Sequence, residues 1–151
     1  MAIAATFMPK GMPRRVWLIT AIAAVVPDID AIGRPFGLGD LALFGGHRAL
    51  THSIALACAA ALVLLLTALR ESPEKLVAWF ALALAIASHG GLDAMTSYGE
   101  NVAFLAPFSD SRYRAPWLLL GDGIVRDTVA FVLLATAARA MIAIRGLPVP
   151  R

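Results

Sequence analysis

The sequence contains a long apolar run, Ile54–Leu69, in which no residue is charged. With the short polar cluster before it, the segment Ala49–Leu69 matches the roughly 20 residues that an α-helix needs to cross a bilayer. Over the whole chain, 60% of the residues are hydrophobic, 15% are charged and the mean hydropathy is +0.77. Soluble domains have about 45–50% apolar and about 25% charged residues. We therefore expect an integral membrane protein, with a very apolar soluble helical bundle as the alternative.

Three further apolar runs complete the expected fold: Val16–Val26, Leu76–Ser88 and Thr128–Ile144. A length of 151 residues fits one domain. We expect an all-α fold in which residues 1–151 form a single membrane-embedded domain, a bundle of about four helices. We interpret Val16–Val26 as a retained first helix rather than a signal peptide. Pro27 and two acidic residues follow it directly, without a clear small-residue cleavage site.

Alternating the four runs across a bilayer brings the loops Pro27–Arg48 and His89–Trp117 to one side. The N-terminus, the charged turn Arg70–Lys75 and the C-terminus then lie on the other side. Most of the 13 Lys and Arg residues belong to that second side, so the positive-inside rule places both termini in the cytoplasm. We expect a multi-pass protein of the inner (plasma) membrane, in contact with the lipid bilayer, whose polar loops face the non-cytoplasmic side.

The chain is basic, with a formal net charge of +3 and an isoelectric point of about 9.6. The basic residues flank the apolar runs, where topology signals lie, and no Lys/Arg run carries interleaved aromatic residues. We therefore expect no nucleic-acid partner. The single cysteine, Cys58, lies inside an apolar run and is expected to be a small core residue rather than a nucleophile.

All three histidines lie in the parts of the chain expected on the non-cytoplasmic side. His89 and Asp93 are four residues apart, so on a helix they share one face and can hold one ion. His47 and His52 do not share a helical face. They can bind together only if the glycine pair before His47 redirects one of them.

Asp28 and Asp30 are separated by one residue and directly follow Pro27. In an extended segment their carboxylates would point the same way, and they would repel each other unless protons or a cation intervened. The three motifs together predict a metal site with enough ligands for a second ion. Its candidate ligands are Asp28, Asp30, His47, His52, His89 and Asp93.

A ligand set of histidine and aspartate without a thiolate suits Zn²⁺, with Mn²⁺ or Fe²⁺ as alternatives. A catalytic ion of this kind lowers the pKa of a bound water to about 7 and supplies hydroxide as the nucleophile. The residues predicted to act in catalysis are Asp28, Asp30, Arg48 and His52, with Asp28 or Asp30 as base and Arg48 holding an anionic substrate group. A metal that only holds the helices together is the alternative. A metal-ion carrier is disfavoured, because Ile54–Leu69 offers only Cys58 and Thr67 as polar groups.

Three sequence elements together resemble a known family. They are Pro27-Asp28-Ile29-Asp30, then His47-Arg48-Ala49-Leu50-Thr51-His52-Ser53, then Ser88-His89-Gly90-Gly91-Leu92-Asp93. In this order they resemble the P-D-x-D, H-R-G-x-T-H-S and H-x-x-x-D elements of the YdjM-type, membrane-bound predicted metal-dependent hydrolases. The resemblance covers the chain from about Pro13 to Trp117, and its middle element is quite specific.

The resemblance implies a membrane-bound, metal-dependent hydrolase whose metal site consists of the six candidate ligands. The YdjM-type family is more distantly similar to the all-helical zinc phospholipases C and nucleases, which implies a phosphoester or lipid-like ester substrate. Two positions depart from the family pattern. Ala49 stands where the family usually has glycine. Thr6 is followed by Phe7, whereas the family's first helix usually carries a Thr-His pair, so we expect the family's N-terminal helix to be missing here.

Overall fold

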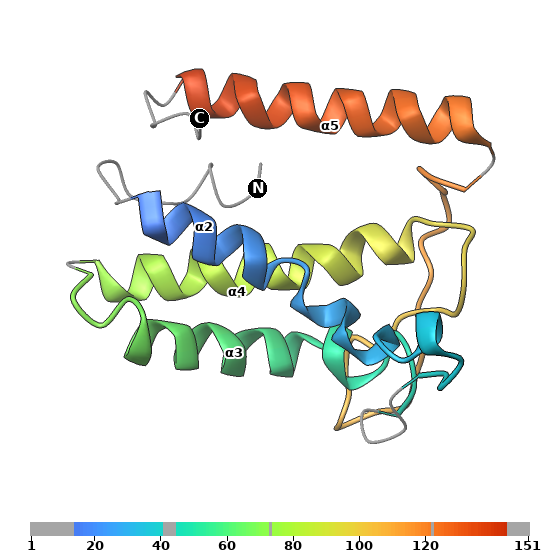
Figure 1. The fold of residues 1–151 in the computed structure, drawn as a ribbon, viewed down its shortest axis with the longest axis horizontal. Helices are drawn as coiled ribbons and strands as arrows, with labels where there is room; N and C mark the ends of the chain where they lie inside the picture. Colours follow the sequence, from blue (N-terminus) through green and yellow to red (C-terminus); the bar gives the residue numbers. More distant parts are fainter. Residues whose placement is uncertain (1–13, 41–44, 73, 122, 145–151) are drawn as a thin grey trace.

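A computed structural model describes residues 14–40, 45–72, 74–121 and 123–144 (Figure 1). These residues form four α-helices: α2 (Arg14–Ala23), α3 (Ile54–Thr67), α4 (Lys75–Ala94) and α5 (Ile124–Ile144). The loops between them contain three short 3-10 helices: η1 (Val26–Ala31), η2 (Arg34–Phe36) and η4 (Leu50–His52). No β-strand occurs in the described residues, which confirms the all-α class. The N-terminal positions that were compared with the family, Thr6 and Phe7, lie outside these ranges.

Two segments are long and apolar enough to cross a membrane, Lys75–Ala94 and Asp127–Ile144. A third candidate is the bent pair Arg15–Ala23 and Val26–Phe36, with an angle of 47° at its break. The expectation that Ala49–Leu69 forms a membrane-crossing helix is wrong. Its first residues form the 3-10 turn η4, and the α-helix that follows has only 14 residues. Such a helix is about 21 Å long, shorter than the hydrocarbon core of about 30 Å.

The bounds of the expected first helix, Val16–Val26, are shifted, because α2 begins at Arg14 and ends at Ala23. Pro27 does not end a helix but lies in the first turn of η1, where its missing N–H leaves no hydrogen bond unmade. Asp28 and Asp30 are therefore on a 3-10 helix and not in an extended segment, in which their carboxylates would have pointed the same way. With three residues per turn, their side chains point about 120° apart around the helix axis. Asp30 is consequently buried, whereas the Asp28 side chain is half exposed.

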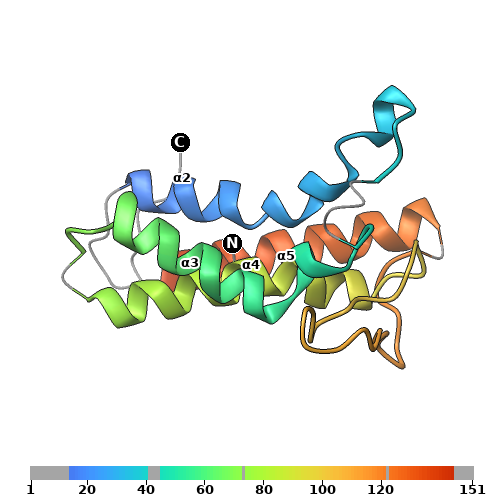
Figure 2. The same cartoon turned by 90° about the horizontal axis from the view of Figure 1, so that it is seen from below.

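The core lies where α4 packs against α3 and α2, which run alongside it in both views (Figures 1 and 2). Helices α3 and α4 form an antiparallel hairpin, as predicted. Their contact is lined by small residues, which let the two backbones approach closely. The alanines at most 1% exposed are Ala57, Ala61, Ala78, Ala81 and Ala85. The indole N–H of Trp79 on α4 also donates to the carbonyl of Cys58 on α3, at 3.1 Å.

Helix α5 contributes little to this core. Among its described side chains, the buried hydrophobic ones are Ala130 and Ile142, whereas Phe131 and Leu133 are largely exposed. Figure 1 shows it running alongside the other helices, on the side away from α3. A helix that is apolar on all sides and barely buried by its own chain is suited to contact with lipid. The described residues therefore form a three-helix core with α5 beside it, and the predicted four-helix bundle is not established.

The loops that carry the predicted site lie together at one end of the helices, opposite the turn between α3 and α4 (Figure 1). The segment after α4 closes over this end. The N–H of Ala103 donates to the carbonyl of Arg48 at 2.9 Å, and the N–H of Ile54 donates to that of Phe104 at 3.0 Å. Tyr98 donates its hydroxyl to Asp127 on α5, and this hydrogen bond raises the pKa of Tyr98.

We predict that Ala81→Leu destabilises the protein, because Ala81 is fully buried in the core. Overpacking a core in this way costs about 1–3 kcal/mol. Thermal unfolding in detergent, followed by circular dichroism, measures the effect. The matched control is Ala135→Leu at an exposed position of α5, which should change stability by less than about 0.5 kcal/mol. Equal unfolding midpoints for the two variants would contradict this packing.

Candidate metal centre

The fully buried side chain of His52 lies at the centre of the polar cluster. It ends η4, directly before Ser53, whose hydroxyl caps α3 by accepting the N–H of Leu56 at 3.1 Å. The Nδ1 atom of His52 lies 3.0 Å from Thr51 Oγ1 and 3.5 Å from Asp30 Oδ2. Its Nε2 atom has no hydrogen-bond partner. One edge of the ring is therefore held by the protein, and the other edge is available to a ligand.

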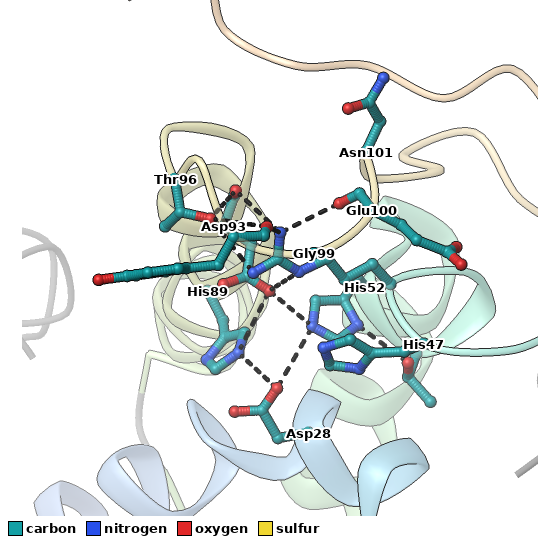
Figure 3. A network of polar contacts seen from close by, with 12 residues as sticks. Asp28, His47, His52, His89, Asp93, Thr96, Gly99, Glu100 and Asn101 are labelled. Carbon is teal, nitrogen blue, oxygen red and sulfur yellow. Dashed lines mark hydrogen bonds and ion pairs between the residues drawn. The ribbon is translucent and has the colours of Figure 1, made fainter. Parts of the chain in front are cut away.

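Four side-chain atoms converge at this free edge of His52 (Figure 3). His52 Nε2 lies 3.0 Å from Asp93 Oδ2 and 3.6 Å from Asp28 Oδ1. His89 Nε2 lies 3.2 Å from the same Asp28 oxygen and 3.8 Å from the same Asp93 oxygen. Ligand atoms bonded at about 2.0–2.1 Å to a tetrahedral ion are about 3.3 Å apart. The four separations of 3.0–3.8 Å lie on both sides of this value, so the group is compatible with a tetrahedral metal ion.

Three of these atoms are buried and lack a hydrogen-bond partner: His52 Nε2, His89 Nε2 and Asp93 Oδ2. Buried polar atoms are normally paired, and an unpaired one costs about 1–3 kcal/mol. One cation in contact with all three atoms would remove this cost. The residues present therefore fit a divalent metal ion.

Asp30 lies behind the two histidines of the central motif. Its Oδ1 atom is 2.7 Å from His47 Nδ1, and its Oδ2 atom accepts hydrogen bonds from the Thr51 hydroxyl and the Arg48 N–H. Asp28, Asp30 and His47 form a second group of potential ligands, which shares Asp28 with the first. Because both Asp30 oxygens already accept hydrogen bonds, Asp30 resembles the carboxylates that orient metal-binding histidines.

Backbone conformation explains how His47 and His52 come together. Gly45 and Gly46 have φ angles of 77° and 86°, and Arg48 has a φ of 60°. These left-handed conformations turn the chain sharply, and the two imidazole rings end with centroids 5.3 Å apart. The glycine pair thus redirects His47, as the sequence indicated. The left-handed conformation of Arg48 costs about 1–2 kcal/mol, so its other contacts must hold it.

The buried guanidinium of Arg48 makes those contacts with the end of α4 and the segment after it. Nη1 donates to the carbonyls of Tyr98 and Glu100 at 2.5 and 3.0 Å, and Nη2 donates to Thr96 Oγ1 at 3.2 Å. Nε lies 3.2 Å from Asp93 Oδ2. Arg48 therefore fixes the Asp93 carboxylate and the loop above it. This geometry favours a positioning role over the substrate-binding role that the sequence suggested.

Gly90 is the point at which α4 approaches η4. A Cβ atom at this position would lie 3.0 Å from the His52 carbonyl oxygen and 3.4 Å from the Phe104 ring. A Cβ atom at Gly91 would meet nothing within 4 Å. The α4 helix continues through both glycines to Ala94, so they do not loosen it. Gly90 lets His52 approach His89, whereas Gly91 has no such role.

The structure thus brings all six predicted ligands into one cluster, divided into two groups that share Asp28. Sequence reasoning missed Thr96 and the carbonyls of Tyr98 and Glu100, which bind Arg48. Backbone carbonyls carry no residue-specific signal, so no motif could have indicated them.

Residues 1–148 match the family of YdjM inner membrane proteins. The chain belongs to the YdjM family. It is also similar to the inner membrane protein YbcI of Escherichia coli (strain K12), with 34% identity over 112 residues. This alignment covers 74% of the chain but 64% of YbcI, so the chain spans less than two thirds of that relative's length. No solved structure matches the chain.

Membership of the YdjM family confirms the resemblance that the three motifs indicated. Both the family and its relative YbcI are described as inner membrane proteins, which agrees with the two apolar helices long enough to span a bilayer. Each of the three motifs that carried the resemblance to YdjM contributes side chains to the polar cluster.

We predict that Gly90→Ala weakens metal binding, whereas Gly91→Ala does not. The added methyl group at position 90 would displace the His52 carbonyl by a few tenths of an ångström. Such a change beside a ligand should lower zinc affinity by about tenfold, the lower end of the effect of losing a supporting contact. Competition with a chromogenic zinc chelator measures the affinity of each variant. Equal losses at both positions would show that Gly90 has no special role.

Proposed function

We propose that this protein is a membrane-bound, metal-dependent hydrolase. One divalent ion is held by four ligands: Asp28, His52, His89 and Asp93. The proposed ion is Zn²⁺, with Mn²⁺ or Fe²⁺ as alternatives. The observation that carries the proposal is the convergence of one Asp28 oxygen with three buried polar atoms that have no hydrogen-bond partner. Family membership supports an inner-membrane setting for this chemistry.

The side chains of the four proposed ligands differ in their exposed fraction, and this difference indicates which of them can act as a base. The side chains of His52, His89 and Asp93 are 0%, 18% and 17% exposed, whereas that of Asp28 is 53% exposed. Asp28 therefore lies on the side by which water and substrate reach the cluster, and it is the proposed base. A bound ion of this kind activates water and polarises an ester or phosphoester oxygen.

The remaining polar residues hold these ligands in place. Asp30 is fully buried and bonded to His47, so we assign it to orienting His47 and His52 rather than to proton transfer. Arg48 orients Asp93. A second ion on Asp28, Asp30 and His47 is the alternative arrangement, which their shared Asp28 supports.

The proposed orientation follows from the distribution of charge. The charged turn between α3 and α4 lies at the end of the helices opposite the polar cluster (Figure 1). In the sequence, this turn and the two terminal segments together carry eight of the 13 Lys and Arg residues. The positive-inside rule then places this turn and both termini in the cytoplasm, and the cluster of this multi-pass, single-domain protein on the non-cytoplasmic face.

A structural metal site is the second candidate. Two histidines and two carboxylates can fill all four positions of a tetrahedral ion, and structural zinc sites are closed in this way. The exposure of Asp28 favours the catalytic reading, because an exposed carboxylate can move aside for water.

We predict that the zinc-loaded, full-length protein in detergent hydrolyses bis(p-nitrophenyl) phosphate or p-nitrophenyl acetate, measured by release of nitrophenol. His52→Ala should reduce the rate to background, because it removes a buried ligand. Asp28→Asn should also reduce the rate while changing the free energy of unfolding by less than about 0.5 kcal/mol, since the side chain of residue 28 is half exposed.

The matched control is Glu71→Gln, which removes an exposed carboxylate at the other end of the helices and should keep full activity. The absence of turnover by protein with bound zinc, together with unfolding of His52→Ala, would replace the catalytic proposal with the structural one.

A further inference from the structure

An apolar groove of about 450 Å³ runs along the helices from the polar cluster. The end of α2 and η1 form one wall, α3 forms the other, and α4 contributes Ile86. Its volume lies in the range of about 300–1,000 Å³ that is common for small-molecule sites. All its lining residues except Thr51 are apolar, so a polar ligand has little to bind there.

The groove begins beside the proposed metal ligands. Two of its lining residues are Pro27 and Thr51, which directly precede Asp28 and His52 in the chain. A molecule that lies in the groove with one end at Pro27 and Thr51 therefore has that end beside the metal group.

The groove has the dimensions of a lipid chain. From Leu56 to Leu64 it follows α3 over nine residues, and the eight steps of 1.5 Å between them span about 12 Å. The hydrocarbon of one leaflet is about 15 Å thick, half of a core of about 30 Å. The small side chains of Ala59 and Ala60 leave space along this length.

The groove walls are open to the side of the helices. Val26, Ile29 and Val63 are 45%, 47% and 60% exposed, although all three are large apolar residues. In a membrane-embedded protein these residues face lipid, so a hydrocarbon chain can enter sideways without passing through water. A soluble substrate needs neither the apolar lining nor this opening.

We propose that the groove binds the alkyl chain of a membrane lipid and places its phosphodiester headgroup at the metal group. The proposal that a lipid phosphodiester is the substrate rests on the proposed function. The proposal that the groove binds an alkyl chain does not. In the reaction, the oxygen of water bonds to phosphorus and one phosphorus–oxygen ester bond breaks. The departing alcohol oxygen takes up a proton from that water.

Photolabelling tests chain binding without any metal. Full-length, metal-free protein in phospholipid nanodiscs is irradiated with a hexadecyl phosphodiester that carries a terminal diazirine, and labelled peptides are mapped by mass spectrometry. We expect labelling of Leu56–Leu64 that excess unlabelled hexadecyl phosphodiester suppresses. Ala60→Phe, which fills the groove, should reduce this labelling by about tenfold, because the chain loses its buried apolar contacts.

The control variant is Ala135→Phe at an exposed position of α5, which should label as the wild type does. If Ala60→Phe fails to fold, Val63→Trp blocks the groove from its exposed wall. Labelling of α3 and α5 to the same extent, with no effect of competitor, would show only general lipid contact and overturn the proposal. Cross-links from the groove to another part of this chain or to a second copy would also overturn it.

Hydrolysis separates this inference from the proposed function. With zinc-loaded protein, we expect hexadecyl p-nitrophenyl phosphodiester to have a kcat/KM at least about tenfold above that of the methyl analogue. Ala60→Phe should abolish this preference, and Ala135→Phe should keep it. Equal kcat/KM values for the two substrates would overturn the proposal that the groove positions a lipid substrate, whereas the proposed hydrolase function would stand. If neither substrate is hydrolysed, the proposed hydrolase function is overturned. The photolabelling experiment would then still test whether the groove binds an alkyl chain.

Discussion

The candidate metal centre depends on the buried side chain of His52. Its imidazole lies between Thr51 and Asp30 on one edge and the other three candidate ligands of its group on the other edge. Thr51 and Asp30 hold one edge of the ring, and the other edge faces Asp93 and Asp28. Burying a polar nitrogen without a hydrogen bond is unfavourable, so this arrangement favours binding of a cation at the free edge. Three local features place His52 in this position. Helix α3 begins only after His52, at Ile54, and Gly90 of α4 lies against the His52 carbonyl. Arg48 adopts a left-handed conformation.

Only 15% of the residues are charged, and the histidines and several of the aspartates lie together in one cluster. Ionisable side chains are costly within hydrocarbon, and they occur there mainly where they have a function. In this protein the histidines and the candidate acidic ligands gather in one cluster, formed by the loops and the end of α4. The alanine-lined contact between α3 and α4 fixes the direction of both helices, and it thereby fixes the position of His52 relative to His89. Packing of the apolar helices and geometry of the polar cluster are therefore coupled.

Much of this organisation could be predicted from the sequence, because it rests on local spacing. The i, i+4 relation of His89 and Asp93 and the glycine turn before His47 both hold in the structure. Features that depend on tertiary contacts could not be predicted. The start of α3 is set by η4 and by Phe104, whose carbonyl accepts the N–H of Ile54. The assignment of Arg48 to a positioning role depends on backbone carbonyls that are remote in sequence.

X-ray absorption spectroscopy of the zinc-loaded, full-length protein tests the central claim most directly. We predict one bound zinc with four nitrogen and oxygen ligands at about 2.0–2.1 Å and the outer-shell scattering of two imidazoles. His89→Ala should reduce the imidazole scattering by about half, as expected when one of two Nε2 ligands is lost. The claim would be contradicted if no zinc remained bound, if the spectrum showed a sulfur ligand from Cys58, or if His52→Ala and His89→Ala both left the spectrum unchanged.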